Sequence, residues 1–394
     1  MQHKSLFILG RQPAIGRAEL ESILGGSHVG LVGLQAVGSD IDPADIPFER
    51  LGGSIRMARI LTVLNTTQWS ELMRYIADYL PQHLGGLPEG KLKLGLSVFD
   101  LPVSVQTLFR TGLELKKVCK RANRSVRLVP NTEVALSSAQ VLHNQLTGDV
   151  GLELLFVQDS KKTYVAQTTN VQNITAYAAR DQHRPKRDAR VGMLPPKLAQ
   201  IIVNLATGPM TPSQGKVVLD PFCGTGVVLQ EAALIGFGIY GTDLEPRMID
   251  YTRENLDWLA RAHNVPAPTL EAGDATNHHW KPGFSSIATE TYLGRPLSGW
   301  PTIDKLREII NTCDVIIEKF MRNLAAQTPP GTRLCLAVPA WKDPSGRIYR
   351  LQLLDHLEDL GYNRVSFEHP DGADLVYSRP EQLVARELLV ITRK

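Results

Sequence analysis

The sequence lacks long hydrophobic runs, paired cysteines and a marked excess of charge. No apolar run approaches the roughly 20 residues that a membrane-spanning helix needs, and no cleavage site typical of a signal peptide follows the N-terminus. Its four cysteines, Cys119, Cys223, Cys313 and Cys335, form no CxxC pair, which argues against a zinc ribbon and a disulfide framework. Lys and Arg number 43 against 40 Asp and Glu, a balance too slight to indicate an anionic partner alone. We therefore expect a soluble, cytoplasmic protein with reduced thiols, no metal site and no membrane segment.

With 394 residues the chain is long enough for two or three domains. From Val217 onward, short apolar strands alternate with helical patterns, including one that predicts a helix near Ile348. This alternation is typical of a parallel sheet covered by helices. The final runs NRVSFE and VARELLVITR predict an antiparallel hairpin at the sheet edge. The first half predicts smaller α+β units, and a stretch rich in charge and proline between Asn173 and Pro196 separates the halves.

A glycine-containing loop follows the first strand of the second half. In VVLDPFCGTG, Val217 to Gly226, Asp220 ends the strand and Gly224 belongs to the turn before a helix. Glycine has no Cβ and lets a ligand approach the backbone, and open α/β sheets bind ligands at the carboxyl ends of their strands. The dinucleotide fingerprint GxGxxG is absent, because Leu229 occupies the third glycine position.

Two acids end or follow the next two strands. Asp243 closes GTD, where it can accept hydrogen bonds from both hydroxyls of a ribose, and Asp274 in GDA can accept from an adenine amino group. A glycine loop, a ribose carboxylate and an adenine carboxylate in this order fit S-adenosylmethionine, which has no phosphate. The alternative interpretation is a tight strand-to-helix turn with acids that serve as helix N-caps.

Several of these motifs together resemble one family. DPFCGTG, GTD, LPPKLAQIIVNLA and the N-terminal layout are similar to the THUMP-containing tRNA guanine-N2 methyltransferases, which modify guanosine 10 of tRNA. The resemblance implies a class I, Rossmann-like methyltransferase domain over residues 191–394, with a mainly parallel sheet and an antiparallel edge hairpin. It also implies an α+β ferredoxin-like domain at 1–50, a THUMP RNA-binding domain at 51–170 and a linker at 171–190. RSVRLVPNTEVALSSAQVLHNQL carries the resemblance to THUMP.

The resemblance implies a cofactor site and a reaction. The expected S-adenosylmethionine site consists of Asp220, Phe222, Gly224, Thr225, Gly226, Asp243, Leu244, Asp274 and Ala275, with Pro196 and Lys197 on a helix that closes over the methionine end. The expected reaction transfers a methyl group to the exocyclic N2 amine of a guanosine in tRNA. A base N-methyltransferase for rRNA or DNA, and a module that binds cofactor and RNA without catalysis, are the alternatives.

The catalytic loop departs from the family pattern. The family has Asp or Asn followed by Pro-Pro-Tyr or Pro-Pro-Phe, whereas this chain has IATETYLG. The lone pair of an exocyclic amine is delocalised into the ring, and acceptors for its N–H groups localise the lone pair for attack. We expect Glu290 to replace the acid, Thr291 to replace a proline, and Tyr292 to stack on the base. The alternative is an ordinary loop after a strand.

Basic residues gather in two places in or before the linker. Lys117, Lys120, Arg121 and Arg124 follow the three-or-four spacing of one helix face, and Arg184, Lys186 and Arg187 lie near the boundary between the halves. Together they predict a phosphate-binding track for tRNA, which would bind through backbone charge and shape. A solvated helix face and a flexible linker are the alternatives. A small activator subunit and the oligomeric state stay open.

Overall fold

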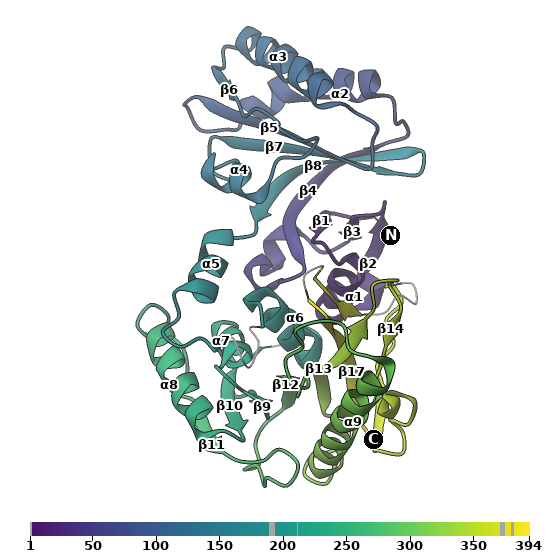
Figure 1. The fold of residues 1–394 in the computed structure, drawn as a ribbon. Helices are drawn as coiled ribbons and strands as arrows, with labels where there is room; N and C mark the ends of the chain where they lie inside the picture. The colour runs from purple at the N-terminus through teal and green to yellow at the C-terminus, as the bar shows by residue number, and fades with distance from the viewer. Residues whose placement is uncertain (1, 189–193, 211, 371–374, 380–381) are drawn as a thin grey trace. The chain divides into compact units, whose positions relative to one another are not determined.

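The computed structural model describes residues 2–188, 194–210, 212–370, 375–379 and 382–394, and they form two compact units (Figure 1). Unit 1 comprises Met1–Pro13, Gly26–Glu49 and Ser54–Ala176, whereas unit 2 comprises Ala14–Gly25, Arg50–Gly53 and Tyr177–Lys394. Two N-terminal segments therefore belong to the same unit as the C-terminal half. No helix among the described residues is long and apolar enough to cross a membrane.

Unit 1 is built on one eight-stranded sheet. Its strands are β1 (Ser5–Leu9), β2 (Val29–Val32), β3 (Ala36–Ser39), β4 (Ser54–Leu64), β5 (Leu92–Phe99), β6 (Val126–Leu128), β7 (Gly151–Asp159) and β8 (Lys162–Val171), in the order β2-β3-β1-β4-β8-β7-β5-β6. β5 pairs in parallel with β6 and β7, and the other neighbours are antiparallel. Because β4 pairs with both β1 and β8, residues on both sides of position 50 share this sheet.

The helices of unit 1 are α2 (Trp69–Leu84), α3 (Val105–Arg121) and α4 (Ser138–His143). α2 and α3 bury apolar residues at helical spacing, including Leu72, Ile76 and Leu80, in one core with β5, β7 and β8. α3 begins after Ser104, whose hydroxyl accepts a hydrogen bond from the amide of Thr107. This N-cap fixes the start of the helix that carries the first basic cluster.

Unit 2 has the predicted mainly parallel sheet. Its strands are β9 (Val217–Asp220), β10 (Gly238–Asp243), β11 (Thr269–Ala272), β12 (Ser286–Glu290), β13 (Arg333–Lys342), β14 (Ile348–Tyr349), β15 (Tyr362–Arg364), β16 (Val376–Tyr377) and β17 (Val384–Arg393). The main path runs β11-β10-β9-β12-β13-β17-β15. β9 to β13 are parallel, and β17 is antiparallel to both β13 and β15. The expected antiparallel edge hairpin is therefore confirmed.

Helices cover both faces of this sheet. They are α1 (Pro13–Leu24), α6 (Pro196–Thr207), α7 (Val227–Leu234), α8 (Pro246–Ala260) and α9 (Ile303–Ala325). A further helix, α5 (Ile174–Gln182), contacts α6 and α7 through Tyr177 and Arg180. Val218 packs in one core with residues of α1, α6, α7 and α8, whereas its neighbour Leu219 packs with α9 in a second core. This alternation follows the period of two along a strand. α5 lies within 171–190, the segment expected to be a linker.

The helix predicted near Ile348 is wrong. This segment contains β14, antiparallel to β13, and then the short 3₁₀ helix η4 (Gln352–Asp355). The carboxylate of Asp343 accepts hydrogen bonds from the backbone amides of Ser345 and Arg347, which closes a tight turn and returns the chain along β13. Residues 371–374 and 380–381, in the connection between the two strands of the predicted hairpin, lie outside the described residues.

Candidate active site

A cavity of about 570 Å³ lies in unit 2 at the carboxyl ends of β9, β10 and β12. This is the edge of an open α/β sheet where ligands bind. Its lining includes Asp220, Phe222, Gly224, Thr225, Asp243, Leu244, Asp274, Ala275, Glu290, Thr291 and Tyr292. The fold therefore brings the expected loop, the two expected cofactor acids and the expected catalytic loop together around one space.

The glycine loop has left-handed backbone angles at its two glycines, and side chains of α8 donate hydrogen bonds to its carbonyl groups. Gly224 and Gly226 have φ angles of 52° and 82°, and α7 begins directly after Gly226. Thr252 donates a hydrogen bond of 2.8 Å from its hydroxyl to the carbonyl of Gly224. Asn255 donates one of 2.8 Å from its amide to the carbonyl of Thr225. These two α8 residues were not expected from the sequence, because nothing in a helical pattern marks a residue that supports a distant loop.

Both expected cofactor acids are held by hydrogen bonds and keep acceptor capacity. Asp243 accepts hydrogen bonds of 2.9 Å from the backbone amides of Gly224 and Glu245, one at each carboxylate oxygen. Its burial raises its pKa above the usual range, and the two amides act in the opposite direction. Asp274 accepts from the amide and hydroxyl of Thr276 at Oδ1, and its Oδ2 has no partner within the described part of the chain. Each carboxylate can therefore receive further N–H or O–H donors.

Asp220 lies at the floor of the cavity and is 1% exposed. Its Oδ1 accepts hydrogen bonds from the hydroxyl of Thr289 at 2.6 Å and from the amide of Phe222 at 3.2 Å. Burial raises the pKa of Asp220 to about 7, helped by the charges of Asp243 and Glu290. This carboxyl therefore changes charge near neutral pH, where a cationic ligand favours its ionised form.

Glu290 ends β12 and is paired with a residue that the sequence analysis missed. Its Oε1 accepts a hydrogen bond of 2.8 Å from Nε of Arg386 on β17. Burial raises the pKa of Glu290, and the guanidinium of Arg386 acts in the opposite direction. Arg386 lies 96 positions away in sequence, so only the pairing of β13 with β17 brings it close.

The other two residues of the catalytic loop differ in role. Thr291 is buried, and both its amide and its hydroxyl donate to the carbonyl of Ala337, which ties the loop to β13. Tyr292 lines the cavity and packs against the core under α9.

The alignment of this loop with the family pattern points to a further residue. In the four-residue family pattern the acid stands three positions before the aromatic residue, and here that position is Thr289. When the loop is aligned on its aromatic residue, Thr289 therefore takes the position of the acid and Glu290 takes that of the first proline.

Pro196 and Lys197 lie outside the described cavity lining. They begin α6, where Nζ of Lys197 is 5.3 Å from the centre of the Tyr177 ring. From the same segment, Leu194 lines the cavity instead. The segment of the expected closing helix thus reaches the cavity through Leu194, two positions before α6 begins.

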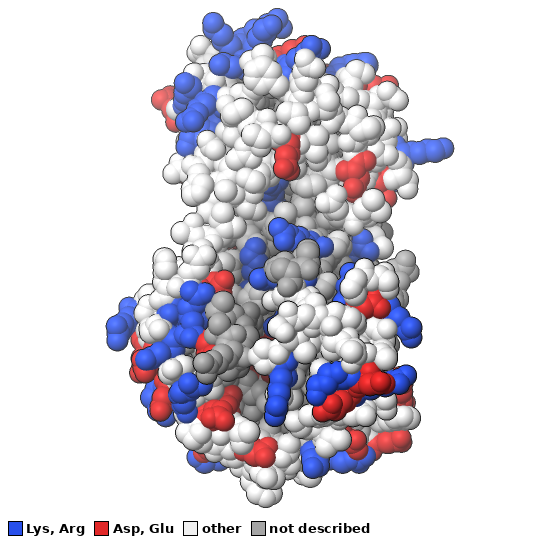
Figure 2. Space-filling view, in the orientation of Figure 1, with Lys and Arg blue, Asp and Glu red and all other residues white. Residues whose placement is uncertain are grey.

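The first basic cluster lies on unit 1. Lys117, Lys120 and Arg121 are exposed on the last turns of α3, and Figure 2 shows Lys and Arg side chains over this helix at the top of the view. Arg124 differs, because it follows the end of the helix and donates a hydrogen bond to the carbonyl of Pro88. The predicted stripe therefore ends at Arg121, where the helix ends.

The second basic cluster lies on unit 2 and is less available. Arg184 is 3% exposed, so it does not form part of the surface. Lys186 forms an ion pair of 3.3 Å with Glu254 and lies over the ring of Tyr251, while Arg187 is exposed. The expectation that Arg184 contacts RNA phosphates at the surface is therefore wrong, because this side chain is buried.

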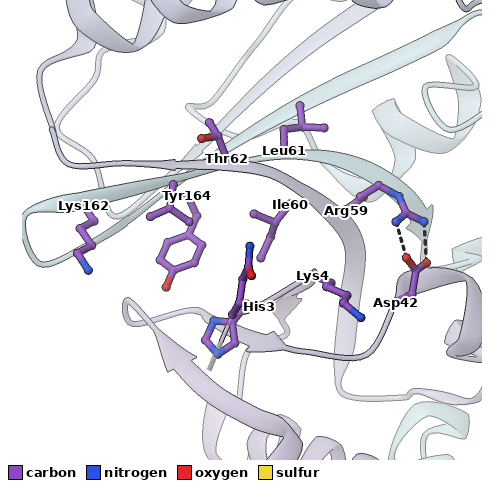
Figure 3. Close-up of a pocket in the computed structure, with 11 residues that line it drawn as sticks. His3, Lys4, Asp42, Arg59, Ile60, Leu61, Thr62, Lys162 and Tyr164 are labelled. Carbon is purple, nitrogen blue, oxygen red and sulfur yellow. Dashed lines mark hydrogen bonds and ion pairs between the residues drawn. The ribbon is translucent and has the colours of Figure 1, made fainter.

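A second cavity, of about 650 Å³, lies in unit 1 beside β4 (Figure 3). Its lining includes Lys4, Arg59, Lys162 and Tyr164, and the rings of Tyr164 and His3 stack with centroids 6.1 Å apart. Asp42 binds the guanidinium of Arg59 through both oxygens, at 2.6 and 2.7 Å. Asp40 and Asp159 also act electrostatically on His3. The acids beside Arg59 and His3 reduce the net positive charge of this cavity, which disfavours a phosphate ligand.

Comparisons with known proteins agree with this geometry. Residues 184–306 match the family of RMKL-like methyltransferase domains. The chain is 48% identical over 152 residues, 39% of its length and 40% of the relative's, to a tRNA (guanine(10)-N2)-dimethyltransferase of Methanothermobacter thermautotrophicus. It is 36% identical over 104 residues, 26% of its length and 29% of the relative's, to the enzyme of that name from Pyrococcus abyssi. The expected resemblance to tRNA guanine-N2 methyltransferases is confirmed, whereas the THUMP domain stays a prediction. These matches span less than half of each relative.

The fold has a counterpart among solved structures. The crystal structure of TrmN from Thermus thermophilus matches with a TM-score of 0.51 and 17% identity, and the match covers 100% of both chains. At this identity the likeness concerns the fold. The expected mixed α/β fold with a Rossmann-like domain is therefore confirmed, and the domain family that matches residues 184–306 is a methyltransferase family.

Proposed function

We propose that this chain is an S-adenosylmethionine-dependent tRNA methyltransferase that methylates the exocyclic N2 amine of a guanosine. One observation carries the proposal. The glycine loop, Asp243, Asp274 and the TETY loop, which is the segment Thr289–Tyr292, surround a single cavity of about 570 Å³. The relatives named for the guanine-N2 reaction and the match to a methyltransferase domain support the substrate and the reaction.

The residues around the cavity fit this cofactor. Asp243 keeps acceptor capacity for ribose hydroxyls, and Oδ2 of Asp274 is available for an adenine amino group. Leu244 is 65% exposed and offers an apolar surface for the adenine ring. Among the described lining residues Arg295 is the one cation, so the cavity suits a ligand without phosphates.

The loop residues perform separate tasks in the proposed reaction. When bound, the cofactor supplies an activated methyl group. Asp220 provides negative charge at the cavity floor for a cationic ligand, because its pKa of about 7 leaves much of it ionised at neutral pH. Glu290 accepts a hydrogen bond from the target amine, which localises the nitrogen lone pair, and Tyr292 stacks on the extruded base.

Unit 1 and the segment before α6 bind the RNA in this proposal. Lys117, Lys120 and Arg121 offer exposed positive charge on one helix end, and Arg187 adds an exposed cation on unit 2. Backbone phosphates are the targets of such residues, since exposed Lys and Arg carry charge without base specificity. tRNA is the partner that the relatives' names support.

The proposal is tested by nucleoside analysis. tRNA from cells with and without the gene is digested and compared by mass spectrometry, and purified full-length protein is then incubated with the unmodified tRNA and S-adenosylmethionine. We expect one N2-methylated guanosine to disappear in the deletion and to return in vitro. Transfer to rRNA or DNA alone would contradict the substrate. Cofactor binding without transfer to any nucleic acid would instead support a binding module.

A further inference from the structure

The TETY loop offers a single carboxylate to a base in the cavity. Thr289 stands where the family pattern has its acid, but this side chain is fully buried and donates its hydroxyl to Asp220 at 2.6 Å. Thr291 is tied to the carbonyl of Ala337. Glu290 is therefore the acid of this loop that lines the cavity.

Arg386 sets the direction of Glu290. Its Nε donates to Oε1 of Glu290 at 2.8 Å, and its Nη1 donates to Oε1 of Gln382 at 3.0 Å, so the guanidinium is held at both ends. The side chains of Glu290 and Arg386 are 15% and 5% exposed. Oε2 of Glu290 has no partner among the residues that the structure describes, and a carboxylate oxygen has two lone pairs. Glu290 thus presents acceptor capacity in a fixed orientation.

We propose that Glu290, oriented by Arg386, selects guanine by accepting hydrogen bonds from the N1–H and the N2 amine of the target base together. This inference rests on the proposed function and adds the basis of its specificity. Guanine presents these donors side by side on one edge, which matches the two oxygens of a carboxylate. Adenine presents a bare N1 acceptor beside its amine, and this lone pair faces the carboxylate with repulsion. Glu290 is then a specificity-determining residue, and Arg386 is a positioning residue.

A base analogue separates this role from a structural one. 2-Aminopurine has the N2 amine of guanine but lacks the proton on N1. The methylated guanosine is first mapped with the parent protein, and a tRNA is then assembled with 2-aminopurine at that position. With 2-aminopurine in place of guanine, we expect kcat/KM of the parent protein to fall on the order of 100-fold. The carboxylate loses the hydrogen bond from N1–H, and a lone pair on N1 faces it instead. Equal kcat/KM on both bases would overturn the inference without any variant.

Glu290→Gln provides the reciprocal test. A glutamine amide can donate to the bare N1 of 2-aminopurine and still accept from the N2 amine, so the ratio of kcat/KM for guanine over 2-aminopurine should fall at least 10-fold. Glu387→Gln is the matched control, because Glu387 is also buried and paired with an arginine, Arg350, but lies outside the described cavity lining. An unchanged ratio in Glu290→Gln would overturn the inference while the proposed function stands. Absence of transfer by the parent protein to any guanosine would overturn the proposed function itself.

Discussion

Asn204 on α6 donates a hydrogen bond of 2.7 Å to the carboxylate of Glu19 on α1, across 185 positions of sequence. The same carboxylate accepts from the amides of Gly52 and Gly53, and Asn204 accepts at Oδ1 from Nε of Arg50. Glu19 and Asn204 are completely buried. Two N-terminal segments are thus built into unit 2 through one polar network.

This network predicts the effect of Asn204→Ala. The substitution leaves a buried carboxylate and a buried guanidinium with fewer partners, so we expect a loss of about 2 to 4 kcal/mol in the free energy of unfolding. Denaturant unfolding of the full chain measures it. Asn363→Ala, at an exposed position on β15, is the control and should change little. Equal midpoints for Asn204→Ala and the parent would show that the network contributes no stability.

The same packing bears on which part of the chain can bind the cofactor. The glycine loop, Asp243 and Asp274 all lie within residues 190–394. Ile15 and Ala18 of α1, however, are part of the core formed with α6 and α7. A fragment without α1 exposes this apolar surface, so cofactor binding is best measured on the full chain.

Asp220 predicts a pH-dependent stability. Its pKa of about 7 lies above the ordinary value of 3.8, so the folded protein holds this proton between about pH 4 and 7, whereas the unfolded chain releases it. The stability that this group contributes is present below pH 4 and is lost as the pH rises to 7. Asp220→Asn removes the dependence, so its stability relative to the parent should increase over this window. The change is on the order of a few kcal/mol, since one pKa unit corresponds to about 1.4 kcal/mol.

Thermal unfolding between pH 4 and pH 8 checks this sign. Asp304→Asn, at an exposed position on α9, is the control for removal of a carboxylate. A relative stability of Asp220→Asn that falls as the pH rises would contradict the assignment of the raised pKa.

Asp243 predicts a specific loss of cofactor affinity. Asp243→Ala removes a charged acceptor for two ribose hydroxyls, and each such hydrogen bond contributes about 1.5 to 3 kcal/mol. Calorimetric titration with S-adenosylmethionine should therefore show at least about 10-fold weaker binding. Asp250→Ala, at an exposed position on α8, keeps the same charge change without reaching the cavity lining. Parent-like affinity in Asp243→Ala would remove Asp243 from the cofactor site.

The sequence predicts the parts of the site that depend on local order along the chain. The glycine loop, Asp243 and Asp274 each end or follow a strand, and parallel strands bring their carboxyl ends to one edge. The contacts of Arg386 with Glu290 and of Asn255 with Thr225 depend on strand order and helix packing, which no local pattern encodes. The structure has a turn at Asp343 where a helix was predicted, because the carboxylate of Asp343 accepts hydrogen bonds from two backbone amides. Such side-chain hydrogen bonds compete with helix formation, and the spacing of apolar residues does not predict them.

The end of α3 predicts the salt dependence of tRNA binding. Lys117, Lys120 and Arg121 are exposed there, and each cation that neutralises a phosphate releases a counterion. Replacing all three by Glu should weaken tRNA binding and reduce the slope of log affinity against log salt by roughly 2 to 3, about one for each lost phosphate contact. Arg124 is left unchanged, because its hydrogen bond to Pro88 gives it a structural role. The effect is measured by filter binding of tRNA at salt concentrations from roughly 50 to 300 mM, the range in which such slopes are resolved.

The control changes charge on unit 2. Glu substitutions at Lys305 and Arg307, which are exposed on α9, should leave the slope unaltered. An unaltered slope in the α3 variant, with S-adenosylmethionine affinity intact, would assign these residues to an ordinary solvated helix face.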